Sequence, residues 1–197
     1  MVIYSSLADP KLIEALKQGA VGILPTDTIY GLVCRAADQA AVNRLYNLKP
    51  REAKTGTLVA ASIEQLVELG FKARYLKPVA NYWPNPISVV VPTEPSIDYL
   101  DKGLGTQPVR IPKHPVLQKL LQQTGPLITT SVNLPGQPEA NTTAEAQNYF
   151  GNQVDFYVDG GDLSGQPPST VIRVVDDAVD ILRQGAVTIN SETGEIE

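Results

Sequence analysis

The stretch Ile23-Leu24-Pro25-Thr26-Asp27-Thr28-Ile29-Tyr30-Gly31-Leu32 joins an apolar segment to two threonines that flank an aspartate. Residues 20–24 predict a buried strand, so the polar triplet stands at the end of that strand. Ligands of open α/β sheets bind at strand ends, and a group of hydroxyls and a carboxylate there indicates a binding site. One such cluster is weak by itself, so the rest of the chain has to supply further polar groups.

Strands and helices alternate in the predicted secondary structure. Asp9 followed by Pro10 is typical of a helix start, and Ser62 with Gln65 forms a capping box. Apolar periodicity predicts helices over 9–19, 38–48, 62–70, 116–121 and 143–150. Short apolar runs predict strands over 20–24, 57–61, 87–91, 109–111, 127–130, 154–158, 171–175 and 186–189. The alternation predicts an α/β fold, and the short late connections predict a sheet that mixes parallel and antiparallel pairs.

The composition is that of an ordinary globular protein. The chain has 197 residues, of which 43% are hydrophobic and 19% are charged, enough to form the core of one domain. We expect that domain to span residues 1–190, followed by a frayed polar tail over 191–197. No apolar run reaches the roughly 18 residues of a membrane helix, and the N-terminus lacks a signal-peptide pattern. These features predict a cytoplasmic protein without a membrane partner.

Two residue types that often carry chemistry occur once each, as Cys34 and His114. This disfavours a zinc site or a Cys-His nucleophile pair. The formal net charge of −5 disfavours non-specific binding of nucleic acid, because that binding depends on clustered Lys and Arg. A local basic cleft, and with it binding of tRNA, is compatible with this charge but weakly supported by it.

Lys49-Pro50-Arg51 follows the helix predicted over 38–48. A loop could direct both cations at a polyphosphate, since Arg offers a planar fork and Lys a point charge. Equally, the two cations could complement the negative end of the preceding helix. The residues alone leave both interpretations open.

Ser131-Val132-Asn133 follows an apolar strand and precedes a turn. A hydroxyl and an amide on one side of an extended backbone can hold a phosphate oxygen or a sugar. The commoner role of an isolated Ser-x-Asn is a turn that satisfies its own backbone. Ser169-Thr170 is a further polar pair at the start of a predicted strand, whereas structural turns account for Asp159-Gly160-Gly161.

Six motifs in order resemble the YrdC/TsaC family, the single-domain threonylcarbamoyl-AMP synthases that begin the t6A modification of tRNA. They are Pro-Thr-x-Thr-x-Tyr-Gly-Leu at 25–32, Lys-x-Arg at 49–51, Val-Arg-Ile-Pro at 109–112, Ser-x-Asn at 131–133, Ser-Thr-Val at 169–171 and Ile-Leu-Arg-Gln-Gly at 181–185. The resemblance implies a twisted mixed sheet flanked by helices around a large, positively lined central cavity. It also implies the reaction of L-threonine, bicarbonate and ATP to threonylcarbamoyl-adenylate, pyrophosphate and water.

The resemblance further implies roles for individual residues. The threonine-binding residues would be Thr28, Tyr30, Arg110, Ser131 and Ser169, with Arg110 facing the substrate carboxylate. The ATP-binding residues would be Lys49, Arg51, Thr55, Thr106, Asn133, Asn141 and Arg183. Lys49 and Arg51 would also be catalytic, because they could neutralise charge that develops on the triphosphate. Mg²⁺ would accompany ATP without dedicated metal ligands in the protein, and proteins of the t6A transferase complex are further expected partners.

One departure from the family pattern concerns the threonine site, because Ala60 stands where many relatives carry a histidine. Two other functions stay open. The chain could be a non-catalytic paralogue, similar to YciO, that binds a nucleotide or RNA in the same cavity. Alternatively, the polar clusters could be no more than helix caps and turns.

Overall fold

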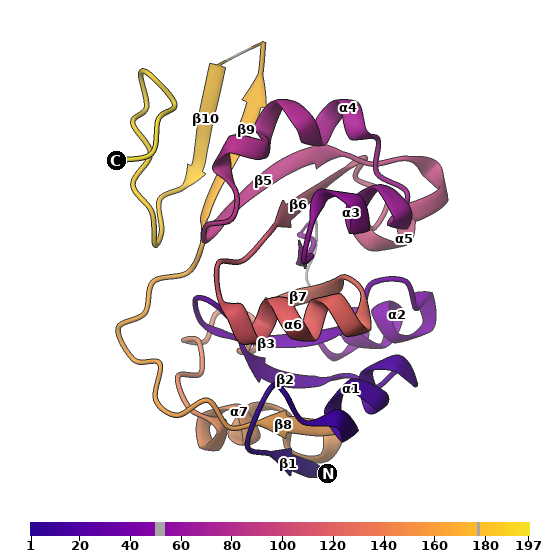
Figure 1. The fold of residues 1–197 in the computed structure, drawn as a ribbon. Helices are drawn as coiled ribbons and strands as arrows, with labels where there is room; N and C mark the ends of the chain where they lie inside the picture. Colours follow the sequence, from indigo (N-terminus) through magenta and orange to yellow (C-terminus); the bar gives the residue numbers. More distant parts are fainter. Residues whose placement is uncertain (50–53, 177) are drawn as a thin grey trace.

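The computed structural model describes residues 1–49, 54–176 and 178–197, and it confirms the predicted α/β class. Ten strands in the described residues form one sheet in the order β1-β8-β2-β3-β7-β4-β6-β5-β9-β10. Their bounds are β1 Val2–Tyr4, β2 Gly22–Pro25, β3 Tyr30–Arg35, β4 Thr57–Val59, β5 Ile87–Pro92, β6 Thr106–Arg110, β7 Leu127–Ser131, β8 Phe156–Val158, β9 Thr170–Val175 and β10 Ala178–Arg183. Figure 1 shows the strands stacked from β10 at the top to β1 at the bottom.

The sheet is mixed, as predicted. β8 pairs in parallel with both β1 and β2, β4 pairs in parallel with β6, and β5 with β9. The other neighbours are antiparallel, including the hairpin of β2 and β3, in which Pro25 lies opposite Tyr30. This hairpin closes directly over the Thr26-Asp27-Thr28 turn. The quoted stretch is therefore a tight connection in the middle of the sheet.

Helices lie on both faces of the sheet. Their bounds are α1 Pro10–Lys17, α2 Gln39–Leu48, α3 Ile63–Leu69, α4 Ala73–Leu76, α5 Asp98–Asp101, α6 Pro115–Thr124 and α7 Thr143–Phe150, with 3₁₀ turns at Lys77–Tyr82, Pro95–Ile97 and Gly151–Gln153. The expected caps form: Asp9 accepts from the Lys11 N–H at 2.8 Å and Ser62 from the Gln65 N–H at 3.4 Å. His114, a single histidine, caps α6 through Nδ1, which accepts from the Leu117 N–H at 3.2 Å.

Alternate residues of each central strand enter different cores, because successive side chains of a strand point to opposite faces. Ile23 and Leu32 pack in one cluster with α2 and α3, whereas Leu24 and Val33 pack in the other with α1 and α6. All four side chains are fully buried. Each contributes about 1.5–3 kcal/mol of hydrophobic stabilisation. These two cores fix the register of the β2–β3 hairpin and so the position of its turn.

The prediction of a strand over 186–189 is wrong. Only Ile189 forms a bridge there, with Ile196, whereas the last strand is β10, which pairs with β9. β10 alternates exposed and half-buried residues, and this pattern is weaker than that of a buried strand. Strands β1 and β3 were not predicted either. The segment 191–197, for which we predicted fraying, contains Gly194, whose carbonyl accepts a hydrogen bond from the Tyr82 hydroxyl at 2.9 Å.

No helix among the described residues is long and apolar enough to span a bilayer.

Candidate functional site

A cavity of about 860 Å³ brings together segments that are far apart in the sequence. Its wall is formed by the β2–β3 turn, the residues before β4, and parts of β6, β7, β9 and β10. Nine of the predicted site residues line it: Thr28, Tyr30, Thr55, Thr106, Arg110, Ser131, Asn133, Ser169 and Arg183. Five of the six sequence motifs, all but Lys-x-Arg, therefore supply residues to the lining of one hollow.

Lys49 lies behind the cavity wall and is only 1% exposed. Its ammonium donates to the Ser131 Oγ at 3.0 Å, and also to the Ser131 carbonyl and the Asn133 Oδ1. The Ser131 hydroxyl donates to the Asn133 Oδ1 at 2.8 Å, and the Asn133 amide donates to the Gln137 carbonyl at 2.7 Å. Ser131 and Asn133 thus form a turn and at the same time bind a buried cation at the cavity edge.

The β2–β3 turn is held by its own hydroxyls. The Thr26 Oγ1 donates to the Ile29 carbonyl at 2.7 Å, accepts from the Thr28 N–H at 3.2 Å, and lies 3.1 Å from the Thr28 Oγ1. Thr28 is 5% exposed and lines the cavity. The turn therefore presents hydroxyl groups to the cavity in a fixed conformation.

Tyr30 joins the cavity wall to the segment after β8. Its hydroxyl donates to the Gly161 carbonyl at 2.8 Å and accepts from the Gly160 N–H at 2.8 Å. Burial raises the pKa of Tyr30 above its ordinary value. Gly160 packs so closely that a Cβ atom there would lie 2.6 Å from the Pro25 ring. Tyr30 lines the cavity, but its hydroxyl is bound by Gly160 and Gly161 of the protein itself.

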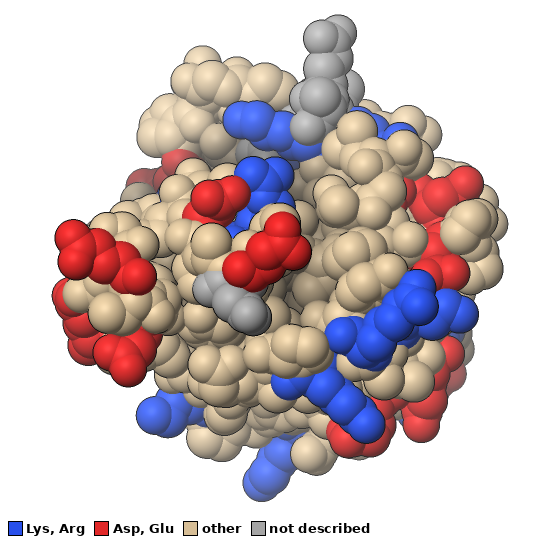
Figure 2. All heavy atoms as spheres, turned by 90° about the horizontal axis from the view of Figure 1, so that it is seen from above, with Lys and Arg blue, Asp and Glu red and all other residues tan. Residues whose placement is uncertain are grey.

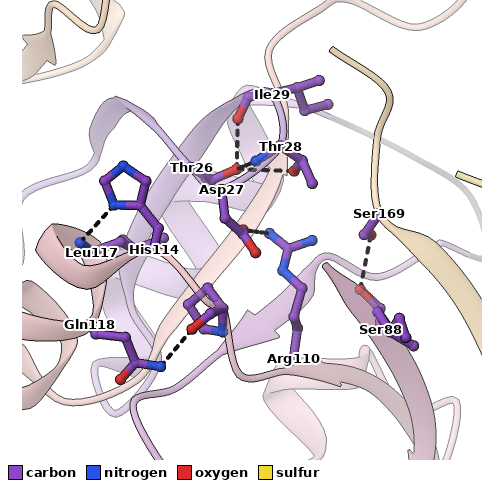
Figure 3. A network of polar contacts seen from close by, with 12 residues as sticks. Thr26, Asp27, Thr28, Ile29, Ser88, Arg110, His114, Leu117, Gln118 and Ser169 are labelled. Carbon is purple, nitrogen blue, oxygen red and sulfur yellow. Dashed lines mark hydrogen bonds and ion pairs between the residues drawn. The ribbon is translucent and has the colours of Figure 1, made fainter. Parts of the chain in front are cut away.

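Arg110, at the end of β6, points towards the β2–β3 turn (Figure 3). Its Nη2 lies 3.0 Å from the Asp27 Oδ1, with side chains that are 4% and 6% exposed. Burial lowers the pKa of Arg110, and the neighbouring Asp27 carboxylate opposes that shift. A buried ion pair therefore stands at the position where the sequence predicted a guanidinium for the substrate carboxylate.

On the opposite wall, Ser169 faces Ser88 with 2.9 Å between their hydroxyls (Figure 3). Arg183 reaches Ser169 from β10, with its Nε donating to the Ser169 carbonyl at 3.0 Å and its Nη2 to the hydroxyl at 3.2 Å. Thr170 points elsewhere, because its hydroxyl binds the segment at Gly185 and Val187. Of the Ser169-Thr170 pair, Ser169 is the residue that lines the cavity.

The charged residues in the cavity lining are mostly positive. They are Lys54, Arg110, Arg173 and Arg183, with Glu139 as the negative member. The surface beyond the cavity is mixed: Figure 2, a view onto the end that carries β9 and β10, shows blue and red side chains interspersed. Positive charge is thus concentrated in a hollow, an arrangement that suits a small anionic ligand.

Besides Lys49, two further predicted site residues have no described place in the cavity lining. Asn141 lies outside its lining, and the Asn141 N–H binds the Glu145 carboxylate at 2.7 Å. Arg51 lies outside the described residues, so its predicted position has no structural counterpart here.

The sequence analysis also missed residues of the site. Asp27 was grouped with its threonine neighbours but given no role of its own. Thr130 and Arg173 also line the cavity, and neither was assigned a role in the site. A sequence signal existed for Thr130, because it directly precedes Ser131 at the end of a strand. None existed for Arg173, which looks in the sequence like an ordinary exposed strand residue.

The fold and the site define an α/β protein with a cation-lined cavity at its strand ends. A family model named for Sua5, YciO and YrdC, and described as "Telomere recombination", matches residues 14–185. The chain belongs to this family. Two curated relatives are named threonylcarbamoyl-AMP synthase: that of Vibrio cholerae serotype O1 is 37% identical over 88% of this chain and 95% of its own length, and that of Vibrio vulnificus is 34% identical over 89% and 97%.

Solved structures of the family show the same fold. Sua5 of P. abyssi, crystallised with L-threonine, superposes with a TM-score of 0.83 at 26% identity, covering 95% of this chain and 58% of the Sua5 chain. E. coli YciO superposes with a TM-score of 0.78, also at 26% identity, covering 94% of this chain and 95% of YciO. The chain spans somewhat more than half of that Sua5 protein and nearly all of YciO.

Proposed function

We propose that this chain is a threonylcarbamoyl-AMP synthase that converts L-threonine, bicarbonate and ATP to threonylcarbamoyl-adenylate, pyrophosphate and water. Its place would be the first step of the t6A modification of tRNA, with the adenylate passed to a t6A transferase complex. The observation that carries the proposal is the convergence of Arg110, Ser131, Asn133, Ser169 and Arg183 on one cavity. The curated relatives that share more than a third of its sequence support the same activity.

The reaction sets two demands on the cavity. Threonine and bicarbonate first combine to a carbamate with loss of water, and a carbamate oxygen then attacks the α-phosphorus while the bond to the departing pyrophosphate breaks. The carbamate is a poor nucleophile, so the cavity has to hold it close to the phosphorus in a fixed orientation. Negative charge then grows on the pyrophosphate, and nearby cations lower the barrier.

The two ends of the cavity suit these demands. We assign the triphosphate to the side of Lys49, Asn133 and Arg183, where a buried ammonium and a guanidinium lie at the wall. We assign threonine to the side of Thr28 and Arg110, where hydroxyls and a fixed guanidinium suit a small zwitterion. Of the other lining residues, we assign Ser131 and Ser169 to threonine, and Thr55 and Thr106 to the nucleotide. Arg51 belongs to this proposal by its sequence motif alone.

Mg²⁺ fits this cavity as a companion of the triphosphate. The described part of the chain contains no group of three His, Cys, Asp or Glu side chains that could hold a metal ion. A magnesium ion commonly keeps its waters and binds substrate phosphates together with one or two carboxylates. When bound, it would neutralise charge on the phosphates, and Glu139 is the acidic residue that lines the cavity.

A second candidate is a non-catalytic paralogue that binds a nucleotide or RNA, and the superposition on YciO favours it. Pyrophosphate release separates the two. The purified protein, mixed with ATP and Mg²⁺, should release pyrophosphate only when both L-threonine and bicarbonate are added. Release without threonine contradicts the synthase. Salt-sensitive tRNA binding without any release would instead support the binding module.

A further inference from the structure

Two hollows lie on either side of the β2–β3 turn. The larger is the cavity described above, and the smaller, of about 390 Å³, is lined by Asp27, His114 and Asp159 among others. Thr26 and Thr28 line both hollows. In the described residues Arg110 lines the larger one and Asp27 the smaller one. The Asp27–Arg110 ion pair therefore crosses the partition between them.

The pair is isolated as well as buried. The Nη2–Oδ1 contact of 3.0 Å is the one ion pair that either side chain makes within the described residues. The Asp27 Oδ2 and the Arg110 Nε are shielded from solvent and have no hydrogen-bond partner there. Asp27 itself has little freedom, because the hydroxyl network of Thr26 and Thr28 holds the turn on both sides of it.

Such a pair is a poor means of stabilising a fold. Withdrawing two charges from water costs free energy that their attraction only partly offsets, and an apolar pair of similar size is often as stable. The pair does, however, fix the direction of a guanidinium that lines the cavity. Arg110 has several rotatable bonds, and a ligand that had to order them would bind more weakly.

We propose that Asp27 is a positioning residue that sets the orientation of Arg110 for the carboxylate of the amino-acid substrate. This inference deepens the proposed function and rests on it. Asp27 acts from the rear, through the partition, and touches no substrate. It holds the buried guanidinium through one contact, Nη2 to Oδ1, and leaves the remaining donors of Arg110 to the threonine side of the cavity. Loss of Asp27 should therefore weaken the binding of threonine and leave the binding of ATP unchanged.

The test compares the wild-type protein with Asp27→Asn, which keeps the size of the side chain and removes its charge. We expect the KM for L-threonine to rise about 10-fold or more, since small misplacements of a binding group have effects of this order. The dissociation constant for ATP and the kcat at saturating threonine should change by less than about 3-fold, as expected when a ground-state binding contact is lost. If Asp27 had a purely structural role, Asp27→Asn would instead weaken the binding of threonine and of ATP together.

A second readout does not require activity. The Arg110 Nε–H resonance in a ¹⁵N NMR spectrum, assigned by its loss in Arg110→Lys, should be sharp in the wild-type protein and broadened or shifted in Asp27→Asn. Asp155→Asn is the matched control, because it breaks the exposed Arg44–Asp155 pair away from the cavity and should leave threonine KM and the Arg110 signal unchanged. Should Asp27→Asn not fold, Asp27→Glu keeps the charge, displaces the guanidinium by one methylene and should show the same selective loss of threonine.

The outcomes separate this inference from the proposed function. Unchanged threonine KM together with an unchanged Arg110 resonance in a folded Asp27 variant overturns the positioning role. If the wild-type protein forms no adenylate, the proposed function fails. The NMR comparison still decides whether Asp27 orients Arg110.

Discussion

The ammonium of Lys49, at the end of α2, lies 3.0 Å from the hydroxyl of Ser131, at the end of β7. The Lys49 side chain is buried there, with 1% of the residue exposed. A lysine at a helix end is usually exposed and complements the helix dipole. Here it is withdrawn from water and bound to Ser131 and Asn133. A positive charge is therefore fixed at the cavity edge before any ligand arrives.

Replacing Lys49 with Met should weaken both folding and nucleotide binding. Ser131 and Asn133 would lose the ammonium that donates to them, and the free energy of unfolding should fall by about 1–3 kcal/mol. The rise in melting temperature caused by saturating ATP should disappear, because the nucleotide phosphates would no longer be attracted by the Lys49 ammonium in the native state. Differential scanning fluorimetry with and without ATP measures both effects. Lys119→Met, on the exposed side of α6, is the control, and an unchanged ATP shift in Lys49→Met would contradict the assignment.

Replacing Tyr30 with Phe should release the segment after β8. The Gly160 N–H would lose its acceptor, and the Gly161 carbonyl its donor. We expect a loss of about 0.5–1.5 kcal/mol in stability and faster amide exchange at Gly160, measured by hydrogen–deuterium exchange. Tyr157→Phe removes a comparable hydroxyl, which binds Gly151 at 2.8 Å, and should leave Gly160 protected. Unaltered exchange at Gly160 in Tyr30→Phe would refute this role of the hydroxyl.

Gly31 lies where a side chain would collide with the cavity wall. A Cβ atom at this position would be 2.3 Å from the Thr129 Oγ1. Gly31→Ala should therefore lower the free energy of unfolding by about 1–3 kcal/mol through overpacking. Adding Thr129→Ala removes the clashing hydroxyl and should restore much of the loss. Urea denaturation of the two single variants and the double variant checks this, and purely additive losses would disprove the steric explanation.

Stability should also depend on alkaline pH through Tyr46. Burial raises the pKa of Tyr46 from 10.0 to about 12, and its hydroxyl donates to the Leu100 carbonyl at 2.5 Å. The unfolded chain therefore loses this proton first, so the free energy of unfolding should fall as pH rises from 10 to about 12. Urea denaturation across this range should give a smaller slope for Tyr46→Phe. Part of the slope should remain, because burial also raises the pKa of Tyr30, Tyr99 and Tyr157; equal slopes would contradict the prediction.

The sequence predicted the central sheet well and its edges poorly. Ile23 and Leu24 enter the two apolar cores in turn, and this apolar run predicted β2, whereas β3, which follows the polar turn, was missed. β10 has no fully buried residue: Val179 and Ile181 pack at the margin of one core, and the residues that alternate with them are exposed. Its register depends on pairing with β9, which local patterns do not contain. The strand was therefore predicted too late in the chain, over 186–189.

The site shows the same division. Ser131 was found because it follows an apolar strand, whereas Arg110 was found through the family motif Val-Arg-Ile-Pro at 109–112. The pairing of Arg110 with Asp27 was missed because it depends on how β6 approaches the β2–β3 turn across the sheet. The burial of Lys49 was missed for a similar reason, since only the folded sheet places β7 beside the end of α2. Sequence motifs thus predicted most residues of the cavity, whereas their hydrogen-bond and ion-pair partners depend on tertiary structure.

The most direct test of the account is to detect the adenylate itself. The protein should be incubated with ATP, Mg²⁺, L-threonine and ¹³C-labelled bicarbonate, and the products should be separated at once by liquid chromatography and mass spectrometry. We predict threonylcarbamoyl-adenylate that carries one ¹³C atom, formed together with pyrophosphate and absent when threonine is omitted. An enzyme preparation that binds ATP and threonine but yields no labelled adenylate would contradict the claim that this cavity joins the two.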